Sequence, residues 1–283
     1  MVERHRSAGR PFDAGGIRSF VREDGAGDPV VCLHGVPSSS FLYRKVVAEL
    51  AARGLSGVAF DLPGLGLADR PAEYDYSWTG LGRFARAAVE ELELNRFHLL
   101  VHDIGGPVGF ELAAAVPERI ASVTILNTMV EVDGFKRPWS MEPFARRGLG
   151  ELYLRSLTKP AFRALMGLQG IGDTSAVPKE ELYAYVDLVK RGDGGRAFLK
   201  VMRGFERTRE KQELYLRALR ELGCPKQVVW GADDPALPLA TLGEAARRAV
   251  RADTVHALPA KHFLQEDQAP AVADRVAALA GTA

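Results

Sequence analysis

The sequence predicts an α/β protein with a mostly parallel central sheet, flanked by helices and interrupted by a helical insertion after the sixth strand. Short apolar, often β-branched runs alternate with segments of helical periodicity before residue 128 and again after residue 226. Between these regions the strand pattern disappears and only amphipathic helical segments remain. Strands that alternate with helices favour parallel pairing under two helical layers.

The strands and helices of the core have readable limits. Turn residues at 13–16 and 25–28 predict a leading antiparallel hairpin within the first thirty residues. Helices are expected at 42–52, which ends before Gly54, and at 108–116, which ends before Pro117. Five further strands are expected at 30–33, 57–60, 97–101, 123–126 and 228–230.

The insertion spans residues 128–222 and is expected to form a helical cap, or lid. Its amphipathic segments are 143–158, 180–190, 197–208 and 211–222. Because the strand pattern resumes after it, the insertion interrupts a core of residues 1–127 and 223–283 and is not a separate C-terminal domain.

Composition limits the kind of partner. The chain has 37 basic and 36 acidic residues, a net charge of +1 and 47% hydrophobic residues. This balance provides no field that would attract nucleic acid or an anionic membrane, so we expect a small, mostly apolar organic substrate and water as partners. The oligomeric state stays open.

The ends and the cysteines indicate a cytoplasmic protein. The polar N-terminus lacks the apolar segment of a secretory signal, and His5 is expected to lie in this polar tail. No window approaches the length of a membrane span. Cys32 and Cys224 lie in or beside apolar runs, which favours packing over a disulfide or a metal site.

Asp103 is the first candidate for chemistry. It lies in LLVHDIGGPVGFELA, residues 99–113, an apolar strand followed by a sharp turn and a helix. A nucleophile elbow needs small residues beside such a turn, and Gly105 and Gly106 supply them. The alternative is that Asp103 only caps the helix that begins near Ile104.

A second turn carries candidate hydrogen-bond donors. His34-Gly35-Val36-Pro37 follows the third predicted strand. This turn can place the backbone N–H of Val36 opposite that of Ile104, which would give two donors for a developing oxyanion.

Two later segments supply a carboxylate and a histidine. In VVWGADDP, residues 228–235, Asp234 is preferred to Asp233 as the group that orients a histidine, and a solvated turn is the alternative. His262 lies in KHFLQED, residues 261–267, after the last strand. Nucleophile, acid and histidine then follow in the chain order expected for this architecture.

These motifs together resemble the haloalkane dehalogenase and epoxide hydrolase branch of the α/β-hydrolases, over nearly the full length. The matching segments are HGVPSSSFLYRK at 34–45, DLPGLGLADRP at 61–71, HDIGG at 102–106 and HFLQED at 262–267. The resemblance implies an α/β-hydrolase fold, Asp103 as nucleophile, Asp234 as acid, His262 as base, and Val36 with Ile104 as the oxyanion hole.

The chain departs from the family pattern at the leaving-group site. Haloalkane dehalogenases generally place a halide-binding tryptophan directly after the nucleophile, where this chain has Ile104, and the only cap tryptophan is Trp139. Epoxide hydrolases use cap tyrosines as the acid, and Tyr153 is the best candidate for that role. Trp139 and Tyr153 are therefore the candidate substrate-binding residues.

Our leading hypothesis is a hydrolase that works through an alkyl-enzyme ester. A carboxylate is ionised at neutral pH, so Asp103 needs no base to attack an electrophilic carbon. No metal or organic cofactor is implied. The alternatives are an epoxide hydrolase with the same core, and a ligand-binding protein that keeps a residual triad.

Overall fold

The computed structural model describes residues 1–283 and contains one eight-stranded sheet in the order β1-β2-β4-β3-β5-β6-β7-β8. β1 and β2 form the predicted hairpin, β2 pairs antiparallel with β4, and every later pairing is parallel. The predicted fold class and all five predicted strands are confirmed. The strands are β1 (Arg10–Ala14), β2 (Ile17–Asp24), β3 (Pro29–Leu33), β4 (Ser56–Phe60), β5 (Phe97–Asp103), β6 (Ile120–Thr128), β7 (Lys226–Gly231) and β8 (Val255–Leu258).

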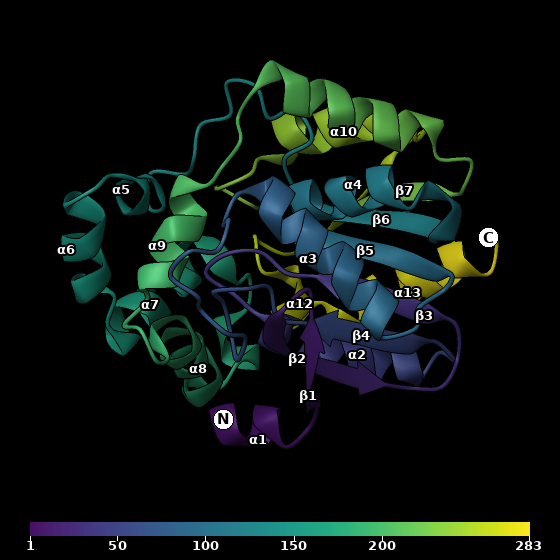
Figure 1. Ribbon diagram of the computed structural model, residues 1–283. Helices are drawn as coiled ribbons and strands as arrows, with labels where there is room; N and C mark the ends of the chain where they lie inside the picture. Colours follow the sequence, from purple (N-terminus) through teal and green to yellow (C-terminus); the bar gives the residue numbers. More distant parts are fainter.

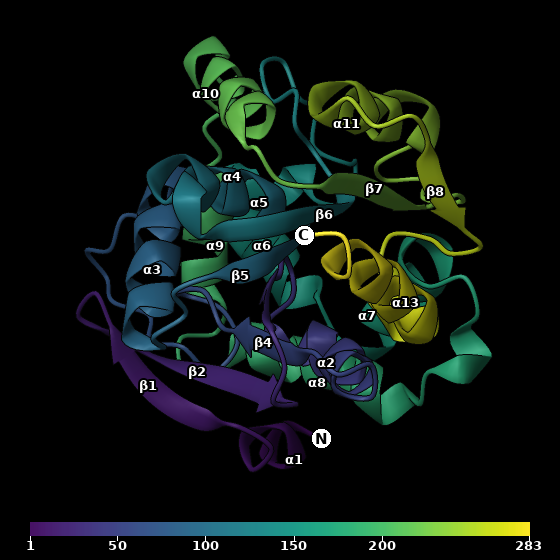
Figure 2. The ribbon, with the colours of Figure 1, turned by 90° about the vertical axis from the view of Figure 1, so that its right-hand side faces the viewer.

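Helices cover both faces of the sheet (Figure 2). One face carries α3 (Trp78–Glu91), α4 (Gly105–Ala115) and α11 (Glu244–Val250), and the other carries α2 (Arg44–Ala51) and α13 (Ala269–Ala280). Each layer encloses its own apolar cluster. Because both faces are covered, every residue of β6 is buried, as expected for a central parallel strand.

The segment between β6 and β7 contains helices α5 to α10. Figure 1 shows α5 to α9 together beyond one end of the strands, while α10 runs beside α4. Tyr215 and Lys211 of α10 both bond the Glu111 carboxylate of α4, so α10 packs on the core although the predicted cap extends to residue 222. The helices are α5 (Glu142–Ala145), α6 (Leu149–Ser156), α7 (Lys159–Leu165), α8 (Lys179–Lys190), α9 (Arg196–Arg203) and α10 (Arg209–Glu221).

Two predicted cap helices differ from the structure. The segment 143–158 is broken into α5 and α6, because Gly148 adopts a φ of 78°, which the right-handed helix forbids. The segment 197–208 ends as α9 at Arg203, where Gly204 follows. A π-helical turn, Met166–Gly170, extends α7 in a part of the cap that the sequence left unassigned.

The N-terminus is not the polar tail that the sequence suggested. Val2–Arg6 form a short helix, α1, and His5 is buried. Its ring packs against Phe20 and Phe41, and its Nε2 lies 3.1 Å from the Ser40 hydroxyl. No helix of the structure is long and apolar enough to cross a membrane.

Candidate active site

The turn after β5 holds Asp103 in the conformation of a nucleophile elbow. Its φ is 52°, a left-handed value that costs free energy for a non-glycine residue and is typical of functional sites. A Cβ on Gly105 would lie 2.1 Å from the Leu33 carbonyl oxygen, so only glycine permits this close approach. The Thr128 hydroxyl donates to the Asp103 carbonyl oxygen and holds the turn against β6.

The Asp103 carboxylate faces the loop after β3 and does not cap α4. The Val36 N–H donates to Oδ1 over 2.7 Å. A Cβ on Gly35 would lie 2.1 Å from the same oxygen, so the glycine makes room for the carboxylate. The buried Ile104 N–H has no partner among the backbone hydrogen bonds of the turn. Of the two backbone groups predicted as oxyanion donors, the Val36 N–H contacts the carboxylate, and Ile104 directly follows Asp103 in the chain.

His34 holds the Val36 turn in place. The Leu62 N–H donates to His34 Nε2 over 3.0 Å, so the proton is on Nδ1, which donates to the Gly35 carbonyl oxygen over 2.9 Å. Burial lowers the pKa of His34, which agrees with this neutral form. Sequence inspection singled out the segment but missed this role.

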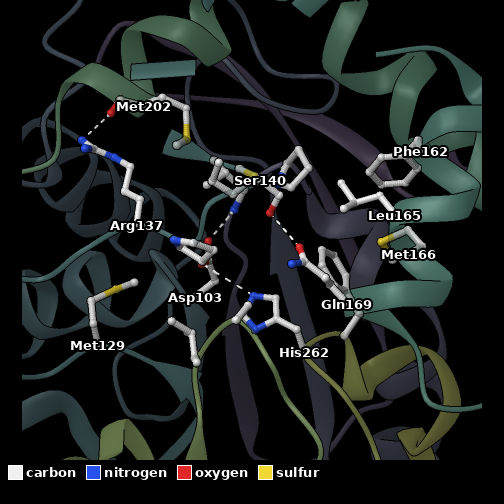
Figure 3. Close-up of a pocket in the computed structure, with 18 of the residues that line it drawn as sticks. Asp103, Met129, Arg137, Ser140, Phe162, Leu165, Met166, Gln169, Met202 and His262 are labelled. Carbon is white, nitrogen blue, oxygen red and sulfur yellow. Dashed lines mark hydrogen bonds and ion pairs between the residues drawn. The ribbon is translucent and has the colours of Figure 1, made fainter. Parts of the chain in front are cut away.

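His262 lies between two carboxylates. Its Nδ1 is 2.8 Å from Asp234 Oδ2, and its Nε2 is 3.7 Å from Asp103 Oδ2 (Figure 3 draws the second pair). The second distance exceeds a hydrogen bond, so His262 Nε2 is not bonded to Asp103 and stays available to a water molecule that approaches from the cavity. The structure therefore brings Asp103, Asp234 and His262 together.

Asp234 is buried and both of its carboxylate oxygens accept hydrogen bonds, whereas Asp233 is exposed. Asp234 Oδ1 accepts from the Ala236 and Leu237 N–H groups over 2.7 and 3.0 Å. Its Oδ2 accepts from the Asn127 amide over 2.6 Å, and Asn127 Oδ1 in turn accepts from the Gly231 N–H. These bonds fix the oxygen that orients His262.

The charges of Asp103, Asp234 and His262 shift one another's pKa values. Burial opposes a charge on His262, but Asp234 and Asp103 together hold its pKa well above the usual value. Burial also opposes ionisation of Asp103, yet the nearby positive charge of His262, with the Val36 N–H, holds the pKa of Asp103 below the usual range. Both shifts favour the ionised carboxylates and the protonated imidazole.

His102, next to Asp103, supports the backbone of His262. Its Nε2 donates to the His262 carbonyl oxygen over 2.8 Å, and the two rings are 4.6 Å apart. Burial, reinforced by the neighbouring His262, lowers the pKa of His102 to about 3. The ring is thus a neutral support for the backbone of His262.

A cavity of about 650 Å³, including its mouth, lies between cap and core at these residues (Figure 3). Twelve of its twenty lining residues are hydrophobic, methionines and phenylalanines among them. Asp103, His262 and Arg137 are the charged residues of its wall. Arg137 donates to the Met202 carbonyl oxygen at the end of α9 and lies against the Phe205 ring, so its charge is engaged with the cap.

The two predicted substrate-binding residues do not line the cavity. Trp139 is 66% exposed, and Tyr153 packs on the Phe144 ring within the cap. Besides Arg137, the polar residues of the cap wall are Ser140 and Gln169, which sequence inspection missed. Neither belongs to a recognisable motif, so only the folded cap reveals them.

Comparison with known proteins agrees with the fold described above. The family model described as alpha/beta hydrolase fold matches residues 28–269. An uncharacterized hydrolase of Saccharomyces cerevisiae is 27% identical over 270 residues, 92% of each chain. Haloalkane dehalogenase 2 of Mycobacterium bovis is 28% identical over 281 residues, which cover 95% of this chain and 92% of that protein.

Solved structures show the same fold. Cfl2 from Burkholderia cenocepacia superposes with a TM-score of 0.82 at 23% identity, covering 95% of this chain and 94% of that one. The epoxide hydrolase CorEH gives a TM-score of 0.78 at 21% identity, with 97% and 98% covered. The resemblance to the haloalkane dehalogenase and epoxide hydrolase branch is confirmed, and the chain belongs to the α/β-hydrolase family, as a hydrolase.

Proposed function

We propose that this hydrolase cleaves small, mostly apolar substrates through an alkyl-enzyme ester on Asp103, with a leaving group that departs as a weakly basic anion such as a halide. One observation carries the proposal: the two oxygens of Asp103 have different surroundings. Oδ1 lies on the Val36 N–H, while Oδ2 faces His262 and the cavity.

The first step follows from that difference. The ionised Oδ2 attacks the electrophilic carbon, a carbon–oxygen bond forms, and the leaving group takes the electron pair of its own bond. No proton moves in this step, since Asp103 is already ionised.

The second step uses His262. Alkylation of Asp103 removes one of the two negative charges that hold the proton on His262, so the ring releases this proton to solvent. A water molecule between His262 Nε2 and the ester then gives its proton to the neutral ring, and its oxygen attacks Cγ of Asp103. The negative charge develops on Oδ1, beside the Val36 N–H, and the Ile104 N–H is the second donor of the proposed oxyanion hole. Collapse of this intermediate releases the alcohol and restores the Asp103 carboxylate, while Asp234 stabilises the imidazolium.

The positions of the cap tyrosines favour a halide over an epoxide. An epoxide oxygen leaves as an alkoxide and needs an acid, but no cap tyrosine lines the cavity. Tyr185 donates to Glu266, Tyr215 donates to Glu111, Tyr153 packs on Phe144, and Tyr183 lies beside Lys159. The likeness to haloalkane dehalogenase 2 of Mycobacterium bovis points in the same direction.

Removal of the base is expected to trap the intermediate. In His262→Phe the first step needs no base, so the ester should form and persist on Asp103. Mass spectrometry of this variant after incubation with 1-bromobutane or 1-iodobutane should show one added butyl group on Asp103. An adduct on another residue, or turnover by Asp103→Ala, would contradict the proposal. Binding without any adduct across haloalkanes would favour a ligand-binding protein.

The neighbouring aspartates provide a matched pair. Asp234→Asn removes the charge beside His262, and we expect a loss of turnover of about a hundred-fold or more. Asp233→Asn changes an exposed carboxylate and should retain nearly the full rate. Steady-state halide release measures both, and the opposite ranking would overturn the assignment of Asp234.

The two steps should respond differently to pH. Protonated His262 cannot accept a proton. Alkylation of Asp103 removes one of the two negative charges that raise the pKa of His262, so the ring loses its proton more easily in the ester. Between about pH 6 and about pH 9 ester hydrolysis should therefore accelerate as the ring loses its proton, while alkylation changes little. Quenched-flow mass spectrometry separates the two rates. Hydrolysis that is independent of pH would argue against His262 as the base.

The leaving group should limit the range of substrates. The usual tryptophan donor is absent, because the residue after Asp103 is Ile104. Ile104 is fully buried and does not belong to the cavity wall. A hydrogen bond to a charged group contributes about 1.5 to 3 kcal/mol, so each missing donor should cost about ten- to a hundred-fold in rate. We expect slow release from 1-chlorobutane and faster release from 1-bromobutane and 1-iodobutane. Equal rates for chloride and bromide, or faster turnover of a matched epoxide, would contradict this interpretation.

A further inference from the structure

We infer that Gln169, on the π-helical turn of the cap, is the catalytic residue that holds the departing anion through its side-chain amide N–H. This assignment rests on the proposed function and adds the group that selects the leaving group. Gln169 lines the same cavity as Asp103 and His262. Figure 3 shows its amide nitrogen on the side of those two residues and its oxygen on the side of Ser140.

Ser140 orients the amide. The hydroxyl of this buried residue donates to Gln169 Oε1 over 2.7 Å. With the oxygen engaged in this way, Nε2 is turned toward the cavity. The reverse orientation would place an amide oxygen opposite the Asp103 carboxylate, where two acceptors repel each other. The charge of the nucleophile thus selects the N–H donor.

The backbone of the turn is fastened to the loop of the base. The His262 N–H donates to the Gln169 carbonyl oxygen over 3.4 Å, and the Phe263 N–H donates to that of Gly170 over 2.7 Å. Lys261 Nζ donates to the Gly167 carbonyl oxygen over 2.7 Å. Three consecutive residues of the His262 loop therefore fix the place of Gln169 relative to the base. Residues 166–170 form a π-helical turn. Such turns are rare in proteins, and many of those that occur lie at functional sites.

The chemistry of an amide defines the substrate class. As Asp103 Oδ2 forms its bond to carbon, the halogen keeps the electron pair of the breaking bond, and the Gln169 N–H stabilises the resulting halide. An amide is too weak an acid to give its proton to an alkoxide. Gln169 therefore suits halides and other weakly basic anions, and it does not serve an epoxide oxygen.

The test compares Gln169→Met with Gln268→Met. Methionine keeps the length of glutamine and removes the N–H, and Gln268 lies outside the cavity wall. In the His262→Phe background we expect Gln169→Met to slow formation of the Asp103 adduct from 1-bromobutane by about ten- to a hundred-fold, with a smaller effect for 1-iodobutane. Gln268→Met should leave both rates unchanged. Ser140→Ala, which releases the amide, should show an intermediate loss for the bromide.

Two further measurements separate a leaving-group role from a structural one. With His262 present, hydrolysis of the preformed ester should keep its rate in Gln169→Met, because the halide has already left. Inhibition of the wild-type enzyme by sodium bromide should weaken about ten-fold in the variant, with sodium sulfate at the same ionic strength as the control. Equal slowing of both steps, or of all halides, would overturn the assignment.

The outcomes also separate this inference from the proposed function. If His262→Phe forms no adduct with any haloalkane, the alkyl-enzyme mechanism itself is wrong. If it forms the adduct and Gln169→Met forms it equally fast, the mechanism stands and the role of Gln169 is wrong.

Discussion

Two carboxylates lie buried beside one apolar cavity, and the positive charge that favours their ionised forms is that of His262, which lies between them. Its ring contacts Asp234 through Nδ1 and faces Asp103 through Nε2. The rest of the site serves this arrangement: Asn127 holds Asp234, His102 holds the His262 backbone, and Val36 holds Asp103. Alkylation of Asp103 would remove one negative charge and so lower the pKa of His262 at the moment when a base is needed.

Much of the core could be predicted because its signals are local. Runs of β-branched residues identify buried strands, and the carboxyl ends of parallel strands meet at one edge of a sheet. Asp103, Asp234 and His262 each follow a strand, so their approach to one another follows from topology alone. Asp234 could be preferred to Asp233 by its spacing from Gly231, and the structure shows the former buried against His262 and the latter exposed.

The cap could not be predicted as well, because the positions of its side chains depend on how its helices pack together, and no strand pairing fixes that packing. Periodicity joined α5 and α6 across Gly148 and left the π-helical turn unassigned. Residue type alone suggested Trp139 and Tyr153 as substrate contacts, yet one is exposed and the other packs within the cap. Gln169 gave no signal, since its position depends on bonds to residues 261–263, far along the chain.

This division has a chemical consequence. In the proposed mechanism the core supplies a nucleophile, a base and oxyanion donors, and these serve the attack and hydrolysis steps whatever group departs from the carbon. Because Ile104 takes the place of the usual tryptophan, our proposal assigns the choice between a halide and an alkoxide to the cap, whose residues line the cavity together with those of the core. Here Glu266, beside the His262 loop, is paired with Arg44 of the core and accepts from Tyr185 of α8, so a tyrosine of the cap is committed to joining cap and core. No cap tyrosine lines the cavity, whereas the Gln169 amide does, so the proposed leaving-group donor can stabilise an anion but cannot protonate one.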